Sequence, residues 1–125
     1  MDKKRFIIEM GIGIEQHGQE VTKAAIKALR DAMSRVCMVG LTEMISLSDP
    51  NDMIIDVLVA CPRPQELDLE AVKKAIPFGQ KEISVVAGGM AVRGHYHPGM
   101  SDKSDEIIVA NAAITVCIDM DKARR

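Results

Sequence analysis

The strongest periodic pattern in the chain lies between residues 20 and 36. Apolar residues recur there every three or four positions, which places them on one face of an α-helix: Val21, Ala24, Ala25, Ala28, Leu29, Ala32, Met33 and Val36. This spacing predicts a helix over residues 20–36, with Gly40 as its stop signal. A second helix is predicted to begin after Asp68, a residue suited to an N-cap, and to end before Pro77.

The other apolar runs predict β-strands. We expect strands at residues 6–10, 44–48, 53–61, 83–93 and 107–119, with the second and third joined as a hairpin by a turn at residues 49–52. Two adjacent glycines, Gly88 and Gly89, indicate a bulge or a close backbone approach within the fourth strand. The final strand is largely apolar on both of its faces.

The order of these elements, β-α-β-β-α-β-β, predicts a single α+β domain over residues 1–125, with a largely antiparallel sheet and two helices on one face. In element order it resembles the trimeric chorismate mutase-like folds, although no motif is shared. Two helices cover only one face, yet several strands are apolar on both. We therefore expect the second face to meet another subunit or to close into a barrel, in a homo-oligomer for which a trimer or its multiple is favoured.

Charge and composition narrow the classes of function. Sixteen basic and eighteen acidic residues give a net charge of −2, and no basic run longer than Lys3-Lys4-Arg5 precedes residues 122–125. Because nucleic-acid binding needs a clustered positive surface, we expect no nucleic-acid partner. No apolar run reaches the length needed to span a bilayer, and the N-terminus does not resemble a signal sequence. We therefore expect no membrane association and a cytoplasmic location.

The three cysteines, Cys37, Cys61 and Cys117, are odd in number and lack C-x-x-C spacing. Cys61 and Cys117 fall in apolar strands, where cysteine behaves as a small hydrophobe. We expect reduced thiols rather than a disulfide framework, with a catalytic cysteine as the lesser alternative.

The residues richest in chemistry run from Gly11 to Gly18, with the sequence Gly-Ile-Gly-Ile-Glu-Gln-His-Gly, between the first strand and the first helix. The glycines Gly11, Gly13 and Gly18 allow a sharp turn and a close approach to a ligand. Free N–H groups at the helix start attract anions. Glu15 and His17 are two residues apart, so they point to the same side of an extended chain. The alternative is a structural ion pair at the start of the helix.

This segment resembles the signature of a small uncharacterised family found in bacteria and plants, marked by G-x-G-x-D-x-H-G near the N-terminus. Gly11, Gly13, His17 and Gly18 match that pattern, whereas Glu15 stands where the family has Asp. The charge is kept, but the carboxylate extends one methylene further. The resemblance implies no particular activity, so function has to be inferred from the residues.

A second candidate segment contains the other two histidines, His95 and His97, after Arg93 and within the polar loop at residues 94–105. An H-x-H pair in extended backbone can place both imidazoles on one metal ion. Together with the earlier residues it gives a candidate set of His17, His95, His97 and Glu15 for a divalent metal such as zinc. Enzymes of tetrahydropterin synthesis have a similar H-x-H spacing. Solvated loop histidines are the alternative, and Arg93 is a candidate for holding a substrate carboxylate or phosphate.

Two functional hypotheses follow. In the first, the protein is a small-molecule enzyme of hydrolase or lyase type, built at subunit interfaces, in which His17 is general base or metal ligand and Glu15 orients it or ligates. The glycine segment, with Gly11, Gly13 and Gly18, would hold an anionic group of the substrate. In the second, the protein is a non-catalytic oligomeric binder of an anionic metabolite or a metal. Metal analysis and the pH dependence of any turnover distinguish the two hypotheses.

Overall fold

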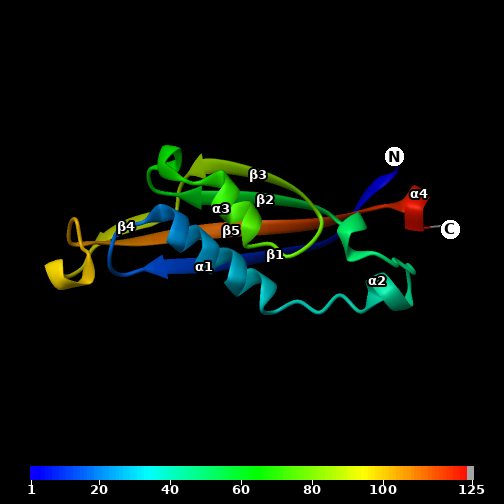
Figure 1. Cartoon of the computed structure of the whole chain (residues 1–125), viewed down its shortest axis with the longest axis horizontal. Coiled ribbons are helices and arrows are strands. Elements are labelled where there is room, and N and C mark those ends of the chain that lie inside the picture. The colour runs from blue at the N-terminus through cyan, green and yellow to red at the C-terminus, as the bar shows by residue number, and fades with distance from the viewer. Residues whose placement is uncertain (124–125) are drawn as a thin grey trace.

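The computed structural model describes residues 1–123 and contains one five-stranded sheet (Figure 1). Arg124 and Arg125, the end of the basic tail, lie outside the described residues. The helices and strands are β1 (Lys3–Glu15), α1 (Val21–Met33), α2 (Gly40–Glu43), β2 (Ile54–Cys61), α3 (Leu69–Lys74), β3 (Gln80–Ala87), β4 (Met90–Arg93), β5 (Glu106–Asp119) and α4 (Met120–Ala123). Among residues 1–123, no helix is long and apolar enough to cross a membrane.

Strand β5 is the centre of the sheet. It pairs antiparallel with β1, β2 and β4, and the remaining pair, β2 with β3, is parallel. Helices α1 and α3 lie on the same face (Figure 1), and the core between them and the sheet is aliphatic. The predicted α+β class, with a largely antiparallel sheet and two helices on one face, is confirmed.

The predicted helix starts are also confirmed. Helix α1 has Glu20 as its N-cap, and its buried residues are six of the eight predicted for the apolar face, without Met33 and Val36. Asp68 caps α3, because its Oδ1 accepts a hydrogen bond from the backbone N–H of Ala71 at 3.2 Å. Helix α1 ends at Met33, earlier than expected, and Gly40 begins the short helix α2.

The strand predicted at residues 44–48 is absent. Burial does alternate there, with Ile45 and Leu47 partly buried against the core and their neighbours exposed. Ser46 has φ 60°, however, so the backbone is not extended. The alternation reflects an irregular segment that lies over the end of the core. Strand β2 therefore pairs with β5 and β3 and does not form the predicted hairpin.

The glycines Gly88 and Gly89 separate two strands, where a single one was predicted at residues 83–93. Strand β2 pairs with β5 as far as Ala60 opposite Asn111, and β4 takes over the same position beside β5 from Met90 opposite Val109. The chain thus crosses from β3, on the outer side of β2, to β4, which lies beyond the end of β2 and beside β5. Gly89 has φ +62°, and an added Cβ would lie 2.0 Å from the carbonyl oxygen of Val109. The predicted close backbone approach is confirmed.

Helix α1 lies unusually close to strand β1, and two glycines make this possible. A Cβ added to Gly11 would lie 2.1 Å from the carbonyl oxygen of Ala28, and one added to Gly13 would lie 2.0 Å from that of Ala24. Both distances are far below van der Waals contact. The helix side of the contact is also built from small residues, since Ala24, Ala28 and Ala32 are fully buried. Gly11 and Gly13 therefore form a shallow groove for the helix backbone.

We predict that Gly13→Ala destabilises the protein by about 2–3 kcal/mol, because the new methyl group must push α1 away from the sheet. Gly99→Ala is the matched control, since nothing lies within 4 Å of its added Cβ. Urea unfolding followed by circular dichroism measures both variants. An unchanged midpoint for Gly13→Ala would contradict the close packing of α1.

Candidate functional site

The second half of the glycine segment turns the chain from β1 into α1. Glu15 is the last residue of β1, and two consecutive left-handed residues follow, Gly18 with φ +88° and Gln19 with φ +54°. This conformation is easy for glycine and unfavourable for glutamine. The side chain of Gln19 must therefore have contacts that hold its backbone in place.

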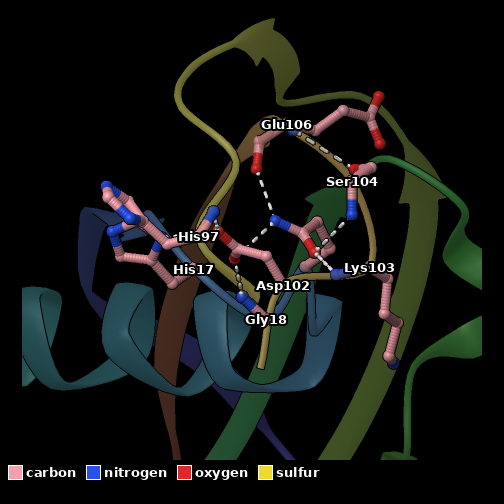
Figure 2. A network of polar contacts seen from close by, with 8 residues as sticks. His17, Gly18, His97, Asp102, Lys103, Ser104 and Glu106 are labelled. Carbon is pink, nitrogen blue, oxygen red and sulfur yellow. Dashed lines mark hydrogen bonds and ion pairs between the residues drawn. The ribbon is translucent and has the colours of Figure 1, made fainter. Parts of the chain in front are cut away.

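Those contacts form a network around one carboxylate, that of Asp102, in the loop at residues 94–105 (Figure 2). Its Oδ1 accepts hydrogen bonds from the backbone N–H of Gly18 at 2.8 Å and from Nε2 of Gln19 at 3.1 Å. Its Oδ2 accepts from Nδ1 of His17 at 2.9 Å and from the backbone N–H of His97 at 2.8 Å. The Asp102 side chain has no exposed surface.

The four hydrogen bonds keep Asp102 ionised. Burial alone would raise the pKa of this carboxyl group, but the hydrogen bonds from His17, His97, Gly18 and Gln19 together hold that pKa far below its ordinary value. A buried carboxylate is tolerated only when its oxygens are satisfied in this way. The anion expected at the N–H groups of the glycine turn is thus supplied by the protein itself.

The amide of Gln19 completes the network. Its Nε2 also donates to the carbonyl oxygen of Glu106 at 2.9 Å, and its Oε1 accepts from the backbone N–H groups of Lys103 at 2.8 Å and Ser104 at 3.3 Å. The side chain therefore uses both donors and both lone pairs. These bonds join the start of α1 to the loop that leads into β5, and they account for the left-handed backbone of Gln19.

Asp102 also fixes the tautomer of His17. An ionised carboxylate only accepts hydrogen bonds, so Nδ1 of His17 carries the proton between them. In the neutral ring, Nε2 then has a lone pair that can accept a proton or bind a ligand. The His17 side chain is 31% exposed, so this nitrogen is within reach of a small molecule. A carboxylate that orients an imidazole is common to general bases and to metal-bound histidines.

A polar cavity of ≈ 470 Å³ lies beside His17, between the start of α1 and the loop. Its lining residues are Glu15, His17, Gly18, Glu20, Lys23, Ile26, Lys27, Arg30, Met100 and Ser101. Lys23 pairs with Glu20 at 2.9 Å, and Lys27 pairs with Glu15 at 3.0 Å. Arg30 forms no ion pair within the described part of the chain. The cavity therefore has one more cation than carboxylates, before any charge on His17.

The three histidines come together, as the sequence suggested. The ring centroids of His17 and His97 are 5.6 Å apart, and those of His95 and His97 are 4.4 Å apart. Figure 2 shows the rings of His17 and His97 side by side at the edge of the network. Glu15 is engaged with Lys27 instead. Within residues 1–123, no group of three or more His, Cys, Asp or Glu side chains is arranged to hold a metal ion.

The glycines and Arg93 lie differently from expectation. What approaches Gly11 and Gly13 is helix α1 and not a ligand, and the N–H of Gly18 is occupied by Asp102. Arg93 is 89% exposed, pairs with Asp105 at 3.3 Å and does not line the cavity. The geometry therefore gives no support to a ligand-binding role for Gly11, Gly13 and Arg93, whereas Gly18 lines the cavity but has its N–H engaged by Asp102.

The cysteines take no part in the site. All three are free, and Cys61 and Cys117 are buried in the sheet. Burial raises the pKa of both thiols, which disfavours the reactive thiolate. Cys37 is exposed and does not line the cavity beside His17.

Three residues of the site were not predicted from the sequence: Asp102 and Gln19, which hold the site together, and Arg30, which gives the cavity its excess positive charge. Asp102 is 85 residues from His17, so no local pattern links the two. The available signal was an aspartate five residues after His97, in a loop next to an H-x-H pair. Arg30 lies outside the apolar face of the predicted helix, so the periodicity that predicts α1 gives it no role.

These features define a small α+β protein with a buried aspartate–histidine pair at the rim of a charged cavity. The chain belongs to the conserved hypothetical protein family Lin0512_fam, whose model matches residues 5–116. The expectation of an uncharacterised family is thereby confirmed. No curated protein matches the chain.

Among solved structures, the chain is similar to a protein from Nostoc punctiforme PCC 73102 that is described as FtsZ-like and of unknown function. The two are 49% identical with a TM-score of 0.86, and the match covers 95% of this chain and 98% of the other. The similarity therefore extends over nearly the whole fold and carries no activity with it.

We predict that Asp102→Asn destabilises the fold and loosens the loop at residues 94–105. In either orientation, the new NH₂ group would face two of the four donors that now bind the carboxylate. The folded-state pKa of Asp102 is lowered, so its stabilising effect is present above the unfolded pKa and is lost as the pH falls.

The difference in unfolding free energy between the wild-type protein and Asp102→Asn should thus be largest above about pH 5 and should decrease below about pH 4. Urea unfolding at a series of pH values measures it. Asp105→Asn is the control in the same loop, because Asp105 forms an exposed ion pair with Arg93 and should contribute little. Equal effects of the two substitutions would contradict the structural role of Asp102.

Proposed function

We propose that the protein binds a small anionic molecule in the cavity beside His17 and that His17 exchanges a proton with it. The observation that supports this most directly is the imidazole held at Nδ1 by the buried Asp102, with Nε2 left for a ligand. The cation-rich lining of the same cavity supports an anion as that ligand.

The anionic class follows from the positions of the charges on α1. Lys23, Lys27 and Arg30 recur at intervals of four and three, so they share the helix face that lines the cavity. The two lysines are balanced by Glu20 and Glu15, whereas Arg30 is unpaired within residues 1–123. A guanidinium binds carboxylate or phosphate oxygens through two parallel hydrogen bonds. We therefore assign Arg30 to the anionic group of the ligand.

The chemistry follows from the aspartate–histidine pair. Neutral His17 can take a proton at Nε2, and the ionised Asp102 then stabilises the imidazolium against Nδ1–H. The same ring can later return the proton to a leaving group. Asp102 thus has the orienting role that the sequence suggested for Glu15, and Glu15 positions Lys27 instead. This arrangement suits proton transfer of hydrolase or lyase type on a substrate that carries a carboxylate or phosphate.

A binder that does not transform its ligand is the second candidate. It is favoured by the lack of a second free carboxylate among the described residues that line the cavity, because Glu15 is held by Lys27 and Glu20 by Lys23. The two candidates share the ligand and the cavity and differ only in turnover. An anion that binds and is then converted, as followed by NMR, would establish the enzyme. Conversion lost in His17→Ala with binding retained would assign the proton transfer to His17.

We predict that phosphate, sulfate or a dicarboxylate binds more tightly at about pH 6 than at about pH 8, because imidazoles gain a positive charge across this range. The pKa of Asp102 and that of Glu20 are lowered, so both stay ionised throughout. His97 and His95 also lie near His17. Calorimetric titration should show that His17→Ala flattens the pH dependence, while His97→Ala leaves most of it.

Arg30→Ala should weaken the same anion by about tenfold or more, since a hydrogen bond to a charged group is worth about 1.5–3 kcal/mol. Arg93→Ala is the matched control, because Arg93 is exposed and outside the cavity. Affinity that is unchanged in both His17→Ala and Arg30→Ala would leave the cavity without an anion-binding role.

A divalent metal such as zinc is an alternative ligand, favoured by the convergence of His17, His95 and His97. Since the described residues do not form a ready set of ligands, the rings of the loop histidines would have to turn toward Nε2 of His17. We predict that any zinc bound at this site is lost in His97→Ala and kept in Cys37→Ser, which removes the exposed thiol. Calorimetry with zinc measures this, and equal binding to both variants would exclude the histidine site.

A further inference from the structure

The face of the sheet opposite α1 and α3 is apolar, and no other part of residues 1–123 covers it. Met10 is 65% exposed, Met90 55% and Ile12 50%, although all three lie within strands. The exposed aliphatic side chains of this open face come from four strands: Ile8, Met10, Ile12, Ile14, Leu58, Val86, Met90 and Val92. Monomeric proteins rarely expose so many neighbouring aliphatic side chains.

Strand register places these side chains together. In β1 the even-numbered residues alternate with Gly11 and Gly13, which are buried under α1, so they project from the open face. Met10 pairs with Ala113 of β5, and Ala113 pairs in turn with Leu58 of β2. Residues in register across adjacent strands point to the same side. The apolar surface is therefore continuous from β1 across β5 to β2.

Charges on the open face gather at one end. Lys3 and Asp56 form an ion pair of 2.9 Å there, Glu82 lies opposite Asp56, and Asp119 lies opposite Lys3. Beyond this end the side chains of the face are uncharged. They include, besides the exposed aliphatic group, Ser84, Ala60, Val109, Asn111, Ala113 and Thr115.

We infer that the open face is covered by another copy of this chain. An uncharged surface is self-complementary, because two copies bring no like charges together. A symmetric arrangement would overlap the apolar parts and leave the charged end of each copy outside the contact. At about 3.3 Å per residue and about 4.8 Å between strands, the apolar part measures roughly 25 by 20 Å. Two copies would bury about 1,000 Å², which is the lower limit for a biological interface.

The charge pattern disfavours a lipid surface as the occupant. Membrane-binding faces are edged by lysines and arginines that contact anionic headgroups. Here the charged end of the face contains both signs, with Lys3 and Arg5 next to Asp56, Glu82 and Asp119. The inference is independent of the cavity beside His17, so either proposal can fail alone.

The test is the mass of the protein in solution, by light scattering coupled to size exclusion at micromolar concentration. The wild-type protein should have at least twice the mass of one chain. Ile12→Asp and Leu58→Asp should each give a monomer with an unchanged circular dichroism spectrum, because both side chains are exposed within a chain. Met44→Asp is the control: Met44 is 84% exposed but lies outside the sheet, so its mass should equal that of the wild type.

A second measurement guards against partial unfolding of the variants. The thermal midpoint of the wild-type protein should rise with protein concentration, and that of Ile12→Asp should not. A monomeric wild-type protein would overturn the inference, whether or not it binds phosphatidylcholine vesicles. Retention of the wild-type mass by both Ile12→Asp and Leu58→Asp would overturn it as well.

Discussion

The site depends on one buried negative charge. The carboxylate of Asp102 is out of contact with water, so all of its hydrogen bonds must come from the protein. The donors belong to two parts of the chain: the turn at residues 17–19 and the backbone of His97. One charge therefore holds the start of α1, the polar loop and the imidazole of His17 in a fixed arrangement. Without this charge, the same three parts would be joined only by the hydrogen bonds of the Gln19 side chain to residues 103–106.

The glycine segment combines two physical roles that look alike in sequence. Gly11 and Gly13 are two residues apart because alternate residues of a strand face the same side, and that side meets α1. Gly18 is needed for another reason, since its backbone is left-handed and its N–H binds Asp102. Along the chain, the groove that accepts α1 at Gly11 and Gly13 is therefore followed by the turn at Gly18 that binds Asp102. None of the three glycines needs the close approach of a ligand to explain it.

The sequence predicted those features of the fold that depend on residues close together in the chain. The face of α1, the cap at Asp68 and the length of β5 follow from periodicity and from side-chain chemistry, and each was found. The convergence of the three histidines was also predicted, because all lie at the ends of strands. Asp102 could not be predicted, since its partners His17 to Gln19 are more than 80 residues away. The alternation at residues 44–48 was misleading, because half-burial alone produces the same pattern.

The crossing at Gly88 and Gly89 connects the open face of the sheet with the loop that contains the histidine cluster. Strand β4 continues the path of β2 beside β5 and leads directly into the polar loop, which lies at the end of the sheet far from the N-terminus and from α4 (Figure 1). The side chains of a strand alternate between faces, so one inserted or deleted residue here would turn β4 over. Met90 and Val92 would then point toward the helices, and His97 would lose its place beside Asp102. The length of this two-residue step thus sets both the open face and the geometry of the histidine cluster.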